Sequence, residues 1–306
     1  MNLTLTIFLM NPQKQNRAKS TEIQLSNFSH LYTLPILLPL LPFIIGLAVR
    51  RGHELQNSRF FPILSGHSHN DYQRPIPLWD AIENGFISIE VDIHLVNGSL
   101  LVGHDEDDLR DDLTLESLYL NPLREYILRQ DGWIYPNKHQ LILFIDIKSD
   151  AESTYNILSG VLAQYSDIVT TYSNNKAQEK AIAVVISGNR SREIMVKERT
   201  RFATYDGRLN DLDEANPSNF IKIISDNWED HFSWRGNETI SDNDREKLIR
   251  IVQAVHKKGY QIRFWKVPSD SRSVREAVWD ELLSAGVDLV TTDELEEYRD
   301  FLLRKK

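Results

Sequence analysis

The chain contains no cysteine among its 306 residues. Disulfide bonds, thiolate nucleophiles and zinc sites with cysteine ligands are therefore excluded. Clusters of basic residues interleaved with aromatics are also missing, and the formal net charge is −9. Because binding to phosphate backbones needs clustered Lys and Arg, we expect no nucleic-acid partner. The hydrophobic fraction of 41% and the charged fraction of 26% are typical of a folded globular protein.

One hydrophobic segment bears on location. Residues 32–49, YTLPILLPLLPFIIGLAV, carry no charge and are followed by Arg50 and Arg51. A helix of this length would span roughly 27 Å, just short of a bilayer core, although its prolines weaken the helix. We predict a transmembrane or signal-anchor segment here, which would anchor the protein to a membrane as a single-pass protein. Residues 1–31 are predicted to form a disordered polar tail, and a secreted protein is the alternative if the segment is cleaved.

From residue 60 onward, short runs rich in β-branched and aromatic residues alternate with longer amphipathic segments. Eight runs are predicted strands: 62–66, 86–92, 141–148, 182–187, 202–205, 221–225, 260–265 and 288–291. Alternation of strands and helices requires a parallel sheet, because each crossover must return to the same edge. Eight such units favour an α/β fold, a (β/α)8 TIM barrel, as a single domain over residues 60–306. An open doubly wound sheet is the alternative, but no Gly-rich phosphate loop follows the first strand.

Polar side chains gather where the predicted strands end, which is the face of a barrel that carries active sites. Glu90 and Asp92 are two residues apart in SIEVDIHL, so a strand directs both carboxylates into the barrel mouth. Asp146 in LFIDIK lies on a strand that we expect to be buried, where a carboxylate needs a partner. A divalent cation would neutralise the three carboxylates, and Lys148 could hold an anion beside it. The alternative is a rim network in which the carboxylates pair with Lys148 and Arg263.

Two histidines near this mouth indicate acid–base chemistry. His67 follows the first predicted strand in SGHSHNDYQRP. Asn97-Gly98 predicts a hairpin turn, which returns His104 toward the mouth. We therefore predict that His67 and His104 flank a bound substrate, one as base and the other as acid. His69 is predicted to shape the loop.

The ordered segments GHSHN, SIEVD, GHD and FIDIK resemble the phospholipase-C-like phosphodiesterase superfamily. That superfamily includes the glycerophosphodiester phosphodiesterases and the sphingomyelinase D toxins. The fuller pattern over residues 62–150 resembles in particular the altered inheritance of mitochondria protein 6 family. The later strands are similar only through IRFWKVP and GVDLVTTD. One departure is Ser68, which stands where glycerophosphodiester phosphodiesterases carry an arginine, and in this respect the chain is more similar to sphingomyelinase D.

The resemblance implies a metal-dependent phosphoric diester hydrolase in which a water or an internal hydroxyl attacks the phosphorus. The implied acid–base pair is His67 and His104. The implied ligands of Mg²⁺ or Ca²⁺ are Glu90, Asp92 and Asp146. The implied substrate contacts are Asn70, Lys148 and Trp265. A lipid-derived phosphodiester is one candidate substrate, and the oligomeric state is left open.

Two other function classes compete with this interpretation. A two-metal amidohydrolase-like phosphoesterase would need further histidines on the fifth and sixth strands, whose ends offer Tyr205-Asp206 and Asp226-Asn227 instead. A catalytically inactive, membrane-tethered barrel that only holds a ligand is the second alternative, because a fold does not fix a function. Against it stands the presence of both histidines and all three carboxylates together.

Overall fold

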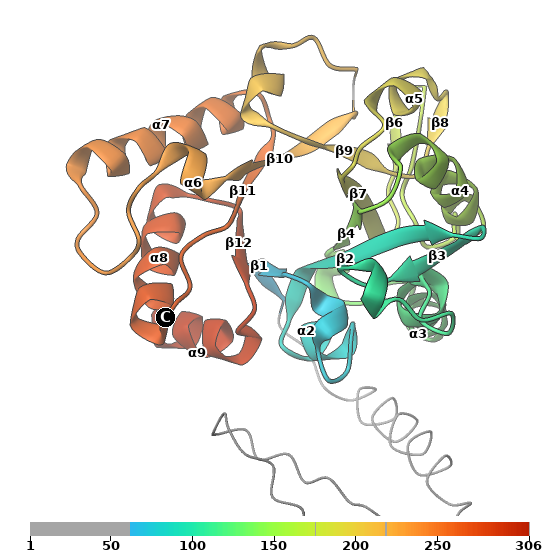
Figure 1. Ribbon diagram of the computed structural model, residues 1–306, viewed down its shortest axis with the longest axis horizontal. Coiled ribbons are helices and arrows are strands. Elements are labelled where there is room, and N and C mark those ends of the chain that lie inside the picture. Colours follow the sequence, from blue (N-terminus) through green and yellow to red (C-terminus); the bar gives the residue numbers. More distant parts are fainter. Residues whose placement is uncertain (1–61, 175, 218, 306) are drawn as a thin grey trace, which may run out of the picture. The chain divides into compact units, whose positions relative to one another are not determined.

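The computed structural model describes residues 62–174, 176–217 and 219–305. Eight parallel strands ring the centre of the view in Figure 1, with helices outside them. In the order of the ring they are β1 (Ile63–Ser68), β12 (Leu289–Thr292), β11 (Gln261–Trp265), β10 (Ile221–Asn227), β9 (Thr204–Gly207), β7 (Ile182–Gly188), β4 (Leu141–Ile147) and β2 (Phe86–Val96). Strand β1 pairs with both β12 and β2, which closes the sheet. The predicted TIM barrel is confirmed.

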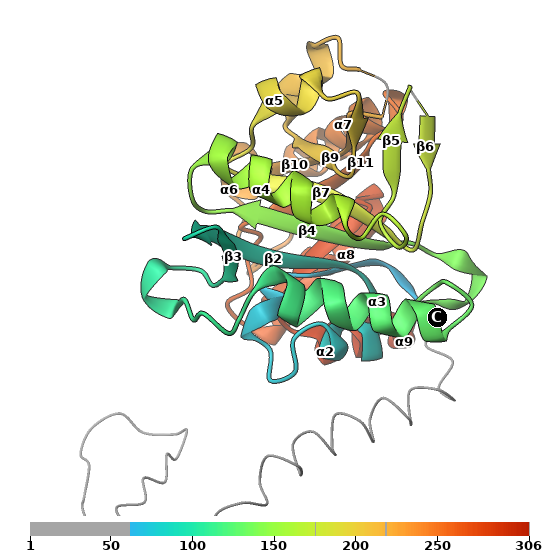
Figure 2. The ribbon, with the colours of Figure 1, turned by 90° about the vertical axis from the view of Figure 1, so that its right-hand side faces the viewer.

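The helices and minor elements connect these strands, and Figure 2 shows α4 along the outside of the barrel strands. The helices are α2 (Trp79–Glu83), α3 (Asn121–Arg129), α4 (Ala151–Ala163), α5 (Arg192–Lys197), α6 (Trp228–His231), α7 (Asp242–Lys257), α8 (Arg272–Ala285) and α9 (Leu295–Lys305). Short helical turns are η1 (Asp71–Gln73), η2 (Glu106–Asp108), η3 (Glu116–Leu120), η4 (Pro136–Lys138) and η5 (Leu209–Asp213). A small antiparallel sheet contains β5 (Thr171–Ser173), β6 (Lys176–Gln178) and β8 (Thr200–Arg201).

Alternate side chains of each strand point to opposite faces of the sheet, either toward the outer helices or into the barrel interior. On β2, Ile89 and Val91 belong to the main hydrophobic cluster that also includes helix residues. The alternate positions Glu90 and Asp92 lie opposite Phe144 and Asp146 of β4 in the register. A second, separate cluster contains five residues of the barrel strands: Ile142, Phe144, Val185, Ile223 and Leu289. The apolar interior therefore supports the carboxylates at the strand ends.

Local sequence signals fix several boundaries. Helix α8 begins after Ser271, whose hydroxyl accepts from the backbone N–H of Val274, and ends at Gly286 in the left-handed region (φ 85°). The predicted hairpin is confirmed, because β2 pairs antiparallel with β3 (Ser99–Val102). Its turn residues Asn97 and Gly98 both have positive φ, as such a two-residue turn requires.

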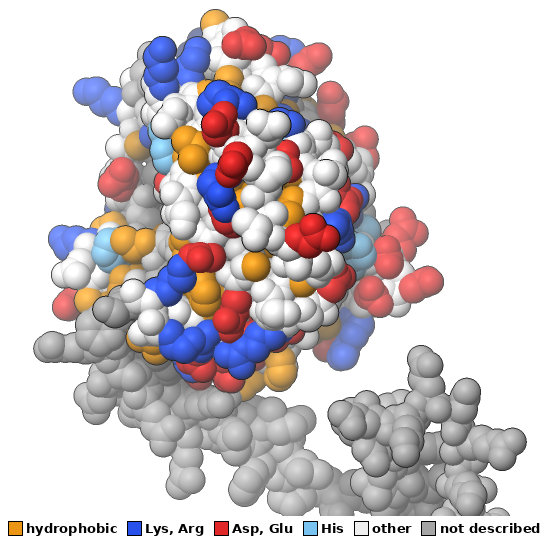
Figure 3. Space-filling view, turned by 90° about the vertical axis from the view of Figure 1, so that its left-hand side faces the viewer, with side chains coloured by type: hydrophobic (Ala, Val, Ile, Leu, Met, Phe, Trp, Pro, Cys, Tyr) orange, Lys and Arg blue, Asp and Glu red, His pale blue; other side chains and the backbone are white. Residues whose placement is uncertain are grey.

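The outer face of the barrel carries charges of both signs. On the side seen in Figure 3, basic and acidic side chains are interspersed rather than separated into fields of one sign. Ion pairs connect neighbouring helices, as between Arg245 of α7 and Glu281 of α8 and between Arg275 of α8 and Glu297 of α9. The Arg275–Glu297 pair is largely shielded from solvent, whereas Arg245 is partly exposed, and a solvated pair of that kind contributes little stability.

The prediction of single-pass membrane anchoring is corrected by the structure. Within residues 62–174, 176–217 and 219–305, no helix has both the length and the apolar character needed to cross a membrane. The segment on which the prediction was based, residues 32–49, lies outside the described residues, as does the predicted tail over residues 1–31.

Candidate active site

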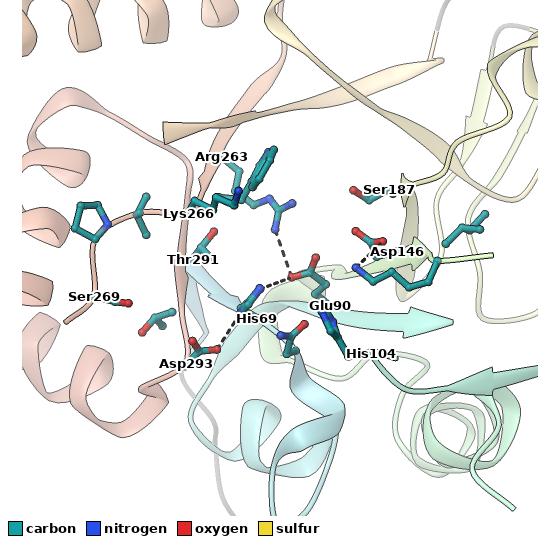
Figure 4. Close-up of a pocket in the computed structure, with 18 of the residues that line it drawn as sticks. His69, Glu90, His104, Asp146, Ser187, Arg263, Lys266, Ser269, Thr291 and Asp293 are labelled. Atoms are coloured by element: carbon teal, nitrogen blue, oxygen red, sulfur yellow. Dashed lines mark hydrogen bonds and ion pairs between the residues drawn. The ribbon is translucent and has the colours of Figure 1, made fainter. Parts of the chain in front are cut away.

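A cavity of about 810 Å³ opens at the carboxyl ends of the barrel strands. Figure 4 shows its wall, to which Glu90 and Asp146 contribute from β2 and β4, and Arg263 from β11. His69 follows β1 and Asp293 follows β12, so the seam that closes the barrel also contributes to the cavity. The volume falls within the range of small-molecule sites. The strand ends thus form one concave site, as the sequence predicted.

Three carboxylates meet at this cavity. Glu90, Asp92 and Asp146 each offer an oxygen, and these oxygens all lie within 4.8 Å of one another. Lys148 lies against two of them, with Nζ 3.3 Å from Asp92 Oδ2 and 3.1 Å from Asp146 Oδ1. Glu90 Oε2 is 3.6 Å from Arg263 Nη1. The structure therefore brings together the three residues that the sequence predicted as metal ligands.

The electrostatics of this triad fit a divalent cation. Burial and the nearby charges of Glu90 and Asp92 together raise the pKa of Asp146 to about 6, against the opposing effect of Lys148. Asp92 Oδ1 is buried without a hydrogen-bond partner, and Asp146 Oδ1 has only the ion-pair contact with Lys148. Buried oxygen acceptors that lack donors are the ligands that Mg²⁺ and Ca²⁺ prefer. The residues present therefore fit such a cation.

His104 is held by one carboxylate of the triad, Asp92. Its Nδ1 is 2.8 Å from Asp92 Oδ2, so an Nδ1–H donates to the carboxylate and Nε2 is left for a substrate. The Tyr72 hydroxyl donates to the same Asp92 oxygen at 2.8 Å. The His104 side chain is 49% exposed, which gives a substrate access to it. His104 therefore lies at the cavity wall, where the hairpin was predicted to place it.

His69 lies between two carboxylates, those of Asp293 and Glu90. Its Nδ1 is 3.0 Å from Asp293 Oδ1, and its Nε2 is 4.0 Å from Glu90 Oε2. Figure 4 shows the imidazole between these two carboxylates. Although burial lowers the pKa of His69, the hydrogen bond to Asp293 and the charge of Glu90 outweigh it and raise the pKa above 6.5. A carboxylate that orients an imidazole in this way is a recurring arrangement for a general base.

His67 lies below the cavity rather than on its wall. It is completely buried, and its Nδ1 is 2.7 Å from Ser88 Oγ. Arg263 Nη1 donates to His67 Nε2 at 2.6 Å, so Nε2 must be unprotonated and cannot also donate to Glu90 Oε2 at 3.4 Å. Burial and the charge of Arg263 lower the pKa of His67 to about 4. This placement favours a supporting position for His67, whereas His69 reaches the cavity.

The predicted substrate contacts all line the cavity. Asn70 has a left-handed backbone (φ 44°), Lys148 lies beside the triad, and Trp265 ends β11. Behind Asn70, the buried carboxylate of Asp71 accepts hydrogen bonds from Ser68 Oγ at 2.9 Å and from Tyr119 Oη at 3.0 Å. These bonds fix the loop that carries Asn70 and His69.

Sequence reasoning assigned no catalytic role to two residues that line the cavity, His69 and its partner Asp293. The first strand was predicted to end at residue 66, but β1 continues to Ser68. His67 therefore belongs to the strand and points into the barrel, whereas His69 is the first residue beyond it. The signal that could have found His69 is the alternation of side chains along a strand, which has a period of two. If the strand includes His67, then His69 is the first residue past its end and lies at the rim of the barrel. Asp293 lies 224 residues away from His69 in the sequence, and only the closure of the barrel brings it close.

Comparison with known families and proteins identifies what this chain is similar to. The family model described as "AIM6-like phosphodiesterase domain" matches residues 57–206 of this chain. Curated relatives are named altered inheritance of mitochondria protein 6. The protein from Eremothecium gossypii is 28% identical over 80% of this chain and 71% of its own length. The homolog from Arthroderma benhamiae is 27% identical over 75% of this chain and 81% of its own length. The resemblance seen in the sequence is confirmed.

The solved structures are more distant. A structure of Thermotoga maritima Cel5A in complex with cellobiose has a TM-score of 0.38 and 15% identity, and it covers 69% of this chain and 80% of that chain. A second Cel5A structure, with mannotriose, has a TM-score of 0.28 and 16% identity over 72% of this chain and 74% of that chain. This likeness is too low to bear on the chemistry of the site.

Proposed function

We propose that the protein is a metal-dependent phosphodiesterase that hydrolyses a phosphodiester in the cavity of its barrel. The observation that carries this proposal is the triad Glu90, Asp92 and Asp146 together with two histidines that contact it, His69 at Glu90 and His104 at Asp92. Each histidine has its own carboxylate partner, so both imidazoles are oriented. The match of residues 57–206 to a phosphodiesterase domain model supports the same reaction class.

The triad is proposed to hold Mg²⁺ or Ca²⁺, because all of its ligand atoms are carboxylate oxygens. When bound, such a cation polarises a phosphoryl oxygen and offsets the negative charge that develops on it. Lys148 supplies a further positive charge at the same place and is proposed to contact the phosphate. Asn70 and Trp265 are proposed to bind the remainder of the substrate, since both line the cavity.

Proton transfer is assigned to the two histidines that line the cavity, His69 and His104. The oxygen of a water, or an internal hydroxyl of the substrate, forms the new P–O bond while its proton passes to His69 Nε2. Asp293 holds His69 through Nδ1 and stabilises the resulting imidazolium. As the P–O bond to the departing alcohol breaks, a protonated His104 gives its proton to that oxygen. His67 is assigned no proton transfer, because Ser88 and Arg263 occupy both of its nitrogens.

The competing functions receive less support. Among the described residues, three or more potential metal ligands come together at the acidic triad, and this group contains no histidine. A two-metal phosphoesterase would need histidine ligands there. A barrel that only holds a ligand would not require two histidines that are each oriented by a carboxylate.

Phosphorus NMR on the full chain tests this proposal. A panel of glycerophosphodiesters, lysophospholipids and sphingomyelin is incubated with Mg²⁺ or with a chelator. We expect a new phosphate resonance that requires the metal, and a cyclic phosphate would reveal attack by an internal hydroxyl. His69→Ala should reduce the rate at least ~100-fold, as the loss of a general base does. His139→Ala is the control, because His139 lies outside the cavity lining. Turnover of no diester by a chain that still binds Mg²⁺ would point to the ligand-holding barrel.

A further inference from the structure

One side of the cavity is separate from the metal triad. Strand β11 ends at Trp265, and the segment from Lys266 to Ser269 continues along the wall. Figure 4 shows Lys266 and Ser269 on the opposite side of the cavity from Asp146 and Ser187. With a volume of about 810 Å³, the cavity has room for the alcohol of a diester on this side while the phosphate lies at the triad.

Lys266 differs from the other cations of the cavity. Among the described lysines and arginines that line the cavity, Lys266 has no carboxylate within 4.0 Å, the distance that defines an ion pair. The others each have a partner: Lys148 with Asp146, Arg208 with Asp206, Arg263 with Glu90, and Arg275 with Glu297. Instead, the Lys266 ammonium lies over the Trp265 ring, 5.3 Å from its centroid. Its positive charge is therefore available to a ligand.

The backbone holds Lys266 in this position. Its φ of +53° lies in the left-handed region, which side-chain-bearing residues rarely adopt. The segment is fixed from behind, because Arg275 Nη1 donates to the Ser269 carbonyl at 3.0 Å while its guanidinium pairs with Glu297. A rare backbone conformation that is held by surrounding contacts is a common feature of ligand sites.

The charge on Lys266 decides which headgroups suit this wall. An aromatic face such as Trp265 is the usual partner of a quaternary ammonium. Here a cation already lies over that ring, so a choline group would meet a like charge. A carboxylate or a second phosphate would instead find an unpaired ammonium, with the Ser269 hydroxyl on the same wall.

We propose that Lys266 and Trp265 form a subsite for a negatively charged group on the alcohol of the diester, and that this subsite disfavours quaternary ammonium headgroups. The inference rests on the proposed phosphodiesterase function and names its substrate class. Substrates of this class are phosphodiesters whose alcohol carries a carboxylate or a further phosphate.

Equilibrium binding of three matched diesters tests the subsite. Glycerophosphoserine and glycerophosphoethanolamine differ by one carboxylate, and glycerophosphocholine carries the quaternary ammonium. Binding is measured calorimetrically with Mg²⁺ in the full chain carrying His104→Ala, which stops turnover. We expect the serine diester to bind at least roughly fivefold more tightly than the other two, the scale of one charge pair in a partly exposed site.

Lys266→Gln and Lys266→Glu separate charge from backbone effects, since both replacements are unbranched and of similar size. The preference should vanish in Lys266→Gln and reverse in Lys266→Glu. Lys222→Glu is the matched control, because Lys222 is an exposed lysine near the start of β10, at the other end of the barrel. The control should keep the preference of the parent chain.

The outcomes separate this inference from the proposed function. Tighter binding of the choline diester, no binding of the serine diester, or a preference unchanged in Lys266→Glu would overturn the subsite. Turnover is followed separately in the chain with an intact His104. If the charge-dependent preference is present but no diester is cleaved, the subsite stands and the hydrolase function fails. If diesters are cleaved without any dependence on residue 266, only the subsite fails.

Discussion

The contact between Gly188 and Asp146 gives the sharpest test of the proposed metal site. Gly188 ends β7 with φ +67°, and a Cβ built there would lie 2.1 Å from Asp146 Oδ1 and 2.5 Å from the Ile147 carbonyl oxygen. Gly188→Ala must therefore move the Asp146 carboxylate. The left-handed backbone costs an alanine about 1 kcal/mol, and relief of the overlap costs about 1–3 kcal/mol more.

We expect Gly188→Ala to lower Tm by several degrees and to weaken Mg²⁺ binding at least ~10-fold, as the displacement of one ligand does. Gly98→Ala is the matched control, because Gly98 also has a positive φ (+84°) but no atom within 4 Å of the added Cβ. It should carry only the backbone penalty and bind Mg²⁺ normally. Calorimetric titration with Mg²⁺ and thermal unfolding measure both effects. Equal metal affinity in the two variants would refute the placement of a cation on Asp146.

Three further substitutions test the surroundings of the cavity by unfolding. His67→Ala removes the acceptor of a buried guanidinium and leaves a void, so urea denaturation should show a loss of about 3 kcal/mol, and a loss near zero would contradict its buried position. Tyr119→Phe removes the hydroxyl that donates to Asp71, and the same assay should show a loss of about 1 kcal/mol rather than a gain. Asp150→Ala removes the cap of α4. Hydrogen bonds from Ser153 lower the pKa of Asp150, so the capping stabilisation is present above its ordinary value of 3.8 and is lost as pH falls through the lowered pKa. The Tm difference from the parent chain should therefore shrink between about pH 6 and about pH 2, and a constant difference would contradict the charged cap.

The barrel could be predicted from sequence because its signals are local. Each barrel strand is a short apolar run, and a turn residue such as Gly286 ends the helix that follows. The triad was also accessible, because Glu90 and Asp92 share one strand face and Asp146 occupies the corresponding place on the neighbouring strand.

The sequence did not show which of His67 and His69 lies at the cavity wall. The answer depends on whether the first strand ends before or after His67, and two further residues of strand move that side chain from the rim to the barrel interior. The partners that distinguish the histidines come from distant parts of the chain, since Arg263 contacts His67 and Asp293 contacts His69. These contacts exist only because β1 pairs with β12, and no local pattern encodes that closure.

The central claim is that the acidic triad and its histidines cleave a phosphodiester with a divalent cation. The most direct measurement is the initial rate of diester cleavage by the full chain as Mg²⁺ is titrated after chelation. Two variants are measured beside it: Asp92→Asn in the triad, and Asp107→Asn in the exposed turn η2 as control. The account predicts a rate that saturates with Mg²⁺, a requirement at least ~10-fold higher in Asp92→Asn, and no change in the control. Cleavage that persists in chelator, or that responds equally to both substitutions, would contradict it.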